Sequence, residues 1–230
     1  MHMSKVYISE DANPLLKEYL SGSNHIIVEI KSTNQVYESI SSHPDIFMCK
    51  INNQIIESEN DLGYSYPGNV KYNGVQLGKY FIHHTGYTAS KLISAVKAAN
   101  LTPVHVTQGY TKCNIVAVDE NSIITSDEGI RNTLIPLGLE VLLVSIGSVK
   151  LKGFSYGFLG GASGRVGDSV VFNGNLSAHP DYLKISDFIL SRGLKLKYFK
   201  EYELEDIGSI IEEKGKYNPI IYKRIIRLYE

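Results

Sequence analysis

Cys113 is the strongest candidate for a nucleophile in this sequence. The thiolate is the reactive form of cysteine, and a neighbouring cation lowers the pKa of the thiol. Lys112 stands directly before Cys113 and could have that effect. The alternative is that Cys113 begins a buried strand, because free cysteine is usually a core residue. The second cysteine, Cys49, lies inside an apolar run and is predicted to be structural.

The motif His-Pro-Asp occurs twice, at residues 43–45 and 179–181. An imidazole beside a carboxylate is suited to general acid–base catalysis, so His43 and His179 are the candidate bases for a thiol nucleophile. A proline biases the residue before it toward extended geometry, so each copy is also compatible with a simple turn. For the second copy the start of a helix is the favoured interpretation, since an amphipathic segment follows it.

Residues 160–167 read GGASGRVG and have the glycine content of a phosphate-binding loop. The segment lacks the GxxxxGK[ST] pattern and leads into a predicted strand instead of a helix N-terminus. Glycines still let backbone N–H groups approach an anion closely, and a guanidinium nearby would add charge. Gly161, Ser163 and Arg165 are therefore candidate ligand-binding residues. The alternative is a rigid turn near the centre of the molecule.

The sequence contains no spacing typical of a metal site. His83 and His84 are adjacent on a predicted strand, so their side chains point to opposite faces and make a poor metal-binding pair. The other histidines, cysteines and aspartates lack the spacing of known metal ligands. We therefore expect neither a metal nor another cofactor.

The composition is that of an ordinary globular protein, with 43% hydrophobic residues, 20% charged residues and a net charge of −1. No strongly basic face is expected, which argues against a nucleic-acid partner. No apolar run approaches the ~20 residues of a membrane span. The absence of a secretory signal and of a CxxC pair predicts a reducing, cytoplasmic location. A small-molecule ligand is the expected partner, and the sequence leaves open whether the chain forms a homodimer.

Residues 110–151 contain the plan that the rest of the chain repeats. Their pattern predicts a strand, a hairpin turn, a second strand, a helix and a third strand. Three hairpins of similar length are predicted, at Met48–Glu57, Cys113–Thr125 and Ser169–Ala178. Asn173-Gly174 is the strongest two-residue turn signal in the chain, so we expect positive φ at both residues.

Four segments share one layout of strand, polar turn, amphipathic helix, Gly or Asn, and strand. Any α/β protein alternates strands and helices, but a doubly wound sheet has no hairpin before each helix. The pattern therefore predicts a single α/β domain over residues 1–230, built from ββαβ units around a pseudo-fivefold axis. Three units should be complete and two partial, and residues 220–229 should pack against the N-terminal strand.

This layout resembles the pentein, or guanidino-modifying-enzyme, fold. That fold includes arginine deiminases, amidinotransferases, dimethylarginine dimethylaminohydrolases and a non-enzymatic ribosome anti-association factor. His43–Met48 looks like the first-hairpin Pro-Asp motif of the hydrolases, which implies a pocket role for Asp45. YGFLGGASG together with Asp206–Ile211 looks closer still to a group of uncharacterised bacterial proteins of this fold.

The departures from the family pattern concern its catalytic residues. Enzymes of the fold use a cysteine near the C-terminus, and the stretch ELEDIGSIIEE contains none. The family's histidine precedes the third hairpin, where this chain has residues 161–165. Where the enzymes of the family have Glu and Asp in the second turn, this chain has Gln108, Lys112 and Cys113. The standard covalent mechanism therefore cannot be carried over.

In a circular array the turns that enter the hairpins point toward the axis, so the candidate site residues should converge. Asp45 and Asp206 would then hold the cationic end of a zwitterionic molecule, and Lys112 and Arg165 its carboxylate or phosphate. Two function classes stay open. One is an enzyme acting on a C–N bond of an amidine-like substrate by a non-standard mechanism, and the other is an interaction protein like the ribosome anti-association factor.

Overall fold

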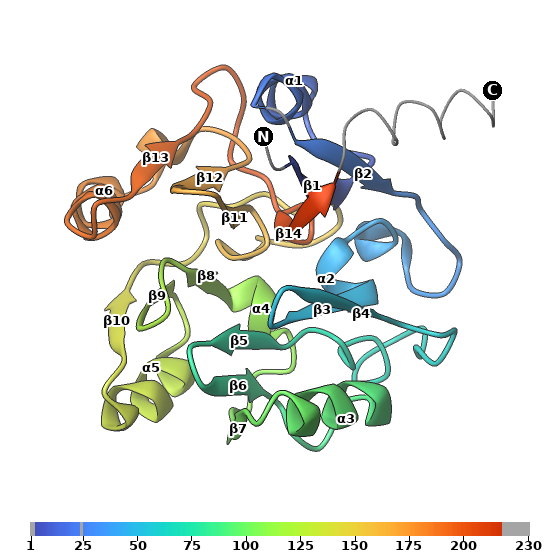
Figure 1. The fold of residues 1–230 in the computed structure, drawn as a ribbon. Helices are drawn as coiled ribbons and strands as arrows, with labels where there is room; N and C mark the ends of the chain where they lie inside the picture. Colours follow the sequence, from blue (N-terminus) through green and yellow to red (C-terminus); the bar gives the residue numbers. More distant parts are fainter. Residues whose placement is uncertain (1–2, 24, 218–230) are drawn as a thin grey trace.

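The structure is a computed structural model that describes residues 3–23 and 25–217. Its strands form five small sheets, and Figure 1 shows helices α1, α3, α5 and α6 on the outside of the molecule. The one-turn helices α2 (Pro44–Phe47) and α4 (Thr111–Asn114) lie further inside. No sheet runs continuously through the described residues, as it would in a doubly wound fold. The chain is thus a mixed α/β protein.

Three sheets have the predicted order of hairpin, helix and parallel strand. In each, two antiparallel strands precede a helix that leads to a third strand, which pairs in parallel with the second. The first is β5 (Val75–Leu77), β6 (Tyr80–His83), α3 (Ser90–Ala98) and β7 (Thr102–His105). The second is β8 (Ile115–Ala117), β9 (Ser122–Thr125), α5 (Glu128–Leu134) and β10 (Glu140–Leu143). The third is β11 (Ser163–Val166), β12 (Ser169–Phe172), α6 (Tyr182–Leu190) and β13 (Lys195–Lys197).

The other two sheets are partial forms of the same unit. One is the hairpin of β3 (Met48–Ile51) and β4 (Gln54–Glu57). The other joins β1 (Met3–Ser9) and β2 (Ile26–Ile30), connected by α1 (Pro14–Gly22), to β14 (Ile211–Tyr217). The end of the described chain therefore pairs with its beginning. The predicted packing of residues 220–229 lies outside the described residues.

Local sequence signals explain the ends of the helices. Asn13 caps α1 by accepting the Leu15 N–H, and Pro14 occupies the first helical position as predicted. Asp127 caps α5 in the same way through the Ile130 N–H. The apolar faces of the helices lie on the sheets and between neighbouring sheets, where the hydrophobic clusters of the core are found. Each described helix is too short or too polar to cross a membrane.

The hairpin predicted around Asn173-Gly174 is wrong. The hairpin lies earlier, between β11 and β12, and turns at residues 167–168. Of the predicted pair only Gly174 has a positive φ, 120°. Asn173 is fully buried; its amide donates to the Glu205 carbonyl and accepts the Tyr202 hydroxyl. Asn173-Gly174 thus holds a distant segment of the chain. The β3–β4 turn is as predicted, with positive φ at Asn52 and Asn53.

Candidate functional site

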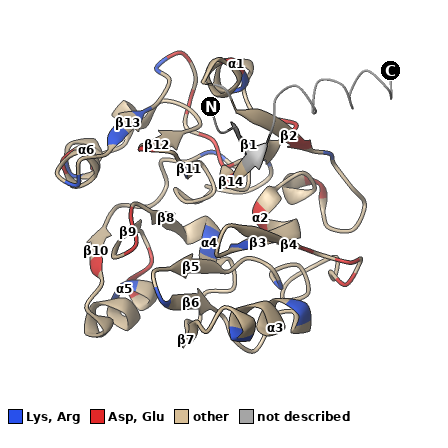
Figure 2. Cartoon of the chain, in the orientation of Figure 1, with Lys and Arg blue, Asp and Glu red and all other residues tan. Residues whose placement is uncertain are grey.

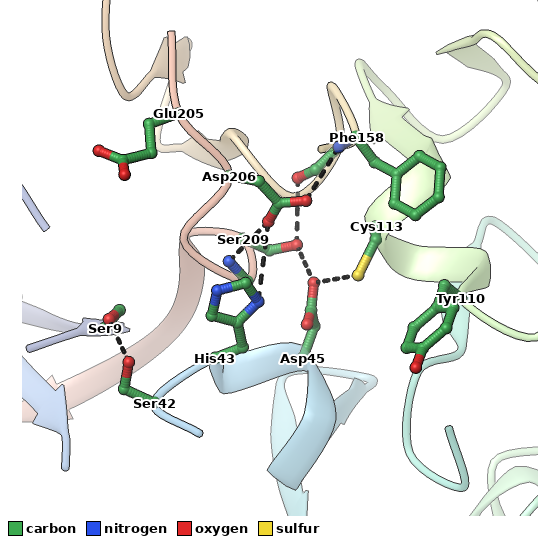
Figure 3. A network of polar contacts seen from close by, with 12 residues as sticks. Ser9, Ser42, His43, Asp45, Tyr110, Cys113, Phe158, Glu205, Asp206 and Ser209 are labelled. Atoms are coloured by element: carbon green, nitrogen blue, oxygen red, sulfur yellow. Dashed lines mark hydrogen bonds and ion pairs between the residues drawn. The ribbon is translucent and has the colours of Figure 1, made fainter. Parts of the chain in front are cut away.

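Two one-turn helices bring polar side chains to the centre of the protein. α2 precedes β3 and carries Asp45, whose side chain is fully buried. α4 precedes β8 and carries Cys113, which is 4% exposed. The expectation that a strand begins at Cys113 is wrong, because residues 111–114 form this helical turn first. Figure 3 shows Asp45 and Cys113 pointing toward each other, although 68 positions separate them.

A continuous hydrogen-bond network joins these residues. The Cys113 thiol donates to Asp45 Oδ2 over 3.1 Å, and the Ser209 hydroxyl donates to the same oxygen over 2.6 Å. Lys112 Nζ donates to Ser209 Oγ over 3.1 Å. The Asn73 amide donates to Cys113 Sγ over 3.2 Å. Four segments far apart in the sequence therefore meet around Asp45, and Figure 3 shows Cys113 and Ser209 at its carboxylate.

Asp206 and His43 lie next to this network. The Asp206 carboxylate accepts the N–H groups of Phe158 and Gly208, at 2.9 and 3.0 Å, and His43 Nδ1 lies 3.8 Å from Asp206 Oδ1. Gly161 is placed so that a Cβ there would lie 2.1 Å from Asp206 Oδ1. Only glycine therefore allows the carboxylate to occupy this position, which gives Gly161 a role in shaping the site.

Burial dominates the protonation of the cluster. It raises the pKa of Asp206 to about 6 and lowers the pKa of His43 to about 4, so His43 is neutral at pH 7. Burial, followed by the negative charges of Asp45 and Asp206, raises the pKa of Cys113 well above its usual value. The net pKa shift of this thiol is therefore opposite to the lowering expected from Lys112. The Lys112 ammonium donates to the Ser209 hydroxyl, and the thiol itself donates to the Asp45 carboxylate.

We expect Cys113 to be unreactive in the folded protein. Its rate of alkylation at pH 8 should be roughly a hundredfold lower than in the urea-unfolded chain, because little thiolate forms at a buried thiol. Mass spectrometry of tryptic peptides measures both cysteines separately, and Cys49, whose pKa burial raises to about 12, is the internal control. Alkylation of Cys113 at the rate of the unfolded chain, with Cys49 protected, would show an activated thiol.

Three cavities adjoin the cluster; one, of about 340 Å³, has a mainly polar lining and reaches His43 and Asp206, and the other two are the candidate binding sites. The first of these two, of about 270 Å³, has aromatic walls and reaches His43, Cys113 and Asp206; we call it the aromatic pocket. The second, of about 540 Å³, is lined by Lys112, Ser163 and Arg165 among others; we call it the basic cavity. Successive helical residues point about 100° apart, so Lys112 and Cys113 line different cavities although they are neighbours. Asp45 lines neither cavity.

The predicted residues therefore converge only in part. Asp45, Lys112, Cys113 and Asp206 meet around one buried centre. Arg165 points into the basic cavity, where its Nε and Nη1 donate to the carbonyls of Gly167 and Val118.

His179 is not part of the cluster. It lies before α6, and its ring accepts the Asp181 N–H over 3.0 Å. Asp181 in turn accepts the Ser145 N–H and hydroxyl. This local role matches the helix-start interpretation of the motif, and it leaves His43 as the histidine closest to the candidate site.

Sequence reasoning missed Ser209 and the aromatic walls. Ser209 lies in the C-terminal stretch where a cysteine was sought, and its φ of 72° is unusual for a residue with a side chain. A single serine in an irregular stretch carries no sequence pattern that would mark it as a site residue. The aromatic walls come from irregular segments without periodicity and consist of Tyr37, Tyr110, Phe154, Tyr156 and Phe158.

Comparisons with known proteins agree with the predicted fold. The model of DUF6873, a family of unknown function, matches residues 51–211. A dimethylarginine dimethylaminohydrolase from Pseudomonas aeruginosa, a cysteine-to-serine mutant complexed with citrulline, is similar with a TM-score of 0.53. It is 9% identical over 90% of this chain and 92% of its own.

A second solved structure shows the same likeness. It is a dimethylarginine dimethylaminohydrolase with a histidine-to-glycine substitution, in an adduct with S-methyl-L-thiocitrulline. Its TM-score is 0.52, with 11% identity over 90% of this chain and 93% of its own. No curated protein matches the chain. At this identity the likeness shows a shared fold, which confirms the resemblance to the pentein fold.

Proposed function

The chain belongs to the DUF6873 family, and from the geometry of its aromatic pocket we propose that it binds a small organic cation of the guanidino or amidine class. The carboxylate of Asp206 would meet the cationic group, and the aromatic rings would cover its faces. We also infer that the five sheets follow the pseudo-fivefold propeller arrangement of the pentein fold. The observation that supports the binding proposal best is the lining of the pocket.

That lining combines aromatic rings with a single carboxylate. Asp206 is its one acidic residue, and no lysine or arginine among the described residues lines it. Aromatic faces attract cations, and the attraction grows when the cation loses contact with water. Phe154 and Tyr156 are 51% and 37% exposed, which places them at the mouth, whereas Tyr110 and Phe158 lie close to Cys113 (Figure 3). A cation could thus enter from solvent and reach the carboxylate.

The protonation of Asp206 fits the same role. Its pKa of about 6 leaves it ionised at neutral pH, and a bound cation would stabilise the charged form further. A guanidinium is planar and presents paired N–H donors that match a carboxylate. The dimethylarginine dimethylaminohydrolases of the same fold hold citrulline and S-methyl-L-thiocitrulline, which have a similar planar end group.

The proposal is one of binding and includes no covalent step. A hydrolase of this fold needs an activated nucleophile, but burial raises the pKa of the Cys113 thiol, and among the described residues its hydrogen bonds are to Asp45 and Asn73. The alternative of an interaction protein that uses the outer surface is less favoured, because a pocket with a buried carboxylate is the feature that calls for a ligand.

Calorimetric titration with arginine, Nω-methylarginine and agmatine tests the proposal. At least one should bind saturably, and Asp206→Asn should weaken that binding about tenfold or more, because it removes the charge that faces the cation. Glu205→Gln is the matched control, since it removes the adjacent carboxylate, which does not line the aromatic pocket. Binding to the unchanged protein should also weaken as the pH falls below about 6, where Asp206 becomes protonated.

A second variant tests the pocket in case Asp206→Asn disturbs folding. Phe158→Leu keeps an apolar side chain of similar size but removes the aromatic face, so it should weaken cation binding several-fold with an unchanged circular dichroism spectrum. The proposal is wrong if none of the cations binds, or if Asp206→Asn and Glu205→Gln bind equally well.

A further inference from the structure

The basic cavity is lined by three cations that make no direct ion pair with a carboxylate among the described residues. Lys50 of β3, Lys112 of α4 and Arg165 of β11 line it. Within residues 3–23 and 25–217, none of the three forms an ion pair within 4.0 Å. Figure 2 shows basic segments of β3 and α4 next to each other near the middle of the molecule. This cavity is separate from the aromatic pocket.

The hydrogen-bond partners of these cations are neutral. Lys50 Nζ donates to the Glu212 backbone carbonyl over 2.8 Å, and Lys112 Nζ donates to the Ser209 hydroxyl. Arg165 uses Nε and Nη1 on two backbone carbonyls, at 2.9 and 2.6 Å. Burial lowers the pKa of Lys50, and the charges of Lys214 and Lys112 add to this effect while Glu212 opposes it. Lys50 and Lys112 therefore lie close enough to repel each other.

The acidic residues that line the same cavity are already engaged. Glu212 accepts the Ser4 hydroxyl and the Gly167 N–H with its two oxygens. Asp119 accepts the Asn121 N–H and lies 3.6 Å from Arg192. Glu120 is exposed. Four basic and three acidic side chains line the cavity in all, so positive charge is in excess.

We propose that the basic cavity binds a small dianionic oxyanion of the phosphate-monoester class. A phosphate offers three terminal oxygens and two charges, which can accept from two ammonium groups and one guanidinium at once. A single carboxylate would leave at least one of the three cations without a partner. The cavity volume of about 540 Å³ leaves room for the organic part of such a molecule.

Titration with inorganic phosphate at constant ionic strength, followed by NMR of 15N-labelled protein, tests the site. Phosphate should bind saturably and shift backbone signals of β3, α4 and β11. Lys50→Gln and Arg165→Gln should each weaken binding about tenfold or more. Lys97→Gln, which removes an exposed lysine on α3, should change it less than twofold. Glu212→Gln removes a competing negative charge and should tighten binding several-fold.

Comparing these variants distinguishes a specific phosphate-binding site from nonspecific electrostatic attraction of anions. If Lys97→Gln weakens phosphate binding as much as Arg165→Gln does, or if phosphate does not saturate, the proposal is wrong. The Glu212→Gln variant tests the proposal even if a lysine or arginine variant folds poorly. If phosphate binds Glu212→Gln more weakly than the unchanged protein, the proposed phosphate site is also wrong. The outcome is independent of the cation test, because the two sets of variants line different cavities.

Discussion

Replacing Gly174 with alanine should reduce the free energy of unfolding by about 3 kcal/mol or more. Gly174 has a φ of 120°, which residues with a side chain rarely adopt. A Cβ there would lie 2.2 Å from the Glu203 carbonyl oxygen and 2.6 Å from Leu204 Cα, both backbone atoms that cannot rotate away. Backbone strain and steric overlap therefore act together at this position.

Gly138→Ala separates the two effects. Gly138 also has a positive φ, 81°, but a Cβ there would meet no atom within 4 Å. Its replacement should cost roughly 1 kcal/mol, from backbone strain alone. Urea unfolding at pH 7 measures both variants. Equal losses for Gly174→Ala and Gly138→Ala would show that residues 203–204 do not press against the Gly174 backbone.

The contrast between Asn173-Gly174 and Asn52-Asn53 shows what could be predicted from the sequence. Asn52-Asn53 forms its turn through the conformational preferences of its own residues, so the local pattern was sufficient. Asn173-Gly174 has similar local chemistry, but its amide is bound by Tyr202 and Glu205. A pattern within ten residues cannot reveal a partner about thirty positions away. Long-range contacts therefore decided the one hairpin that was misplaced.

The same distinction applies to the candidate site. The repeat of hairpin units placed Asp45, Cys113 and Asp206 near one centre, because equivalent turns of similar units face the same way. Lys112 and Cys113 line different cavities because α4 is a single helical turn. The apolar run after Cys113 favours a strand, so the sequence pattern did not predict this turn. The aromatic walls come from irregular segments, and no periodicity marks such residues in advance.

The free energy of unfolding should fall steeply in acid because of buried histidines. Burial lowers the pKa values of His43 and His83 to about 4, whereas an unfolded chain binds the proton near pH 6.5. The unfolded state therefore takes up protons first as the pH falls. Each histidine contributes stability that is complete above pH 6.5 and is lost as the pH falls toward 4. The loss is about 3 kcal/mol for each.

The protonation of Asp206 has the opposite effect on the free energy of unfolding over nearly the same pH range. Its pKa of about 6 in the folded state exceeds the ordinary value of 3.8, so the folded state binds its proton first. This adds about 3 kcal/mol between pH 6 and 4 and roughly offsets the neighbouring His43. His83 is fully buried in a different part of the protein, between the Val70 carbonyl and the Thr88 hydroxyl. The change in stability caused by protonation of His83 is therefore not offset by Asp206.

His83→Gln should isolate this contribution. The variant loses some stability at pH 7, but it has no imidazole to protonate, so its stability relative to the unchanged protein should rise by about 3 kcal/mol between pH 7 and pH 4. Urea unfolding at half-unit pH steps gives both curves. Thr88→Val is the control, because it removes a hydrogen bond to His83 while the buried imidazole stays. Its curve should run nearly parallel to that of the unchanged protein. A parallel curve for His83→Gln would mean that His83 takes up its proton in the folded state as readily as in the unfolded chain, and burial would then not control its pKa.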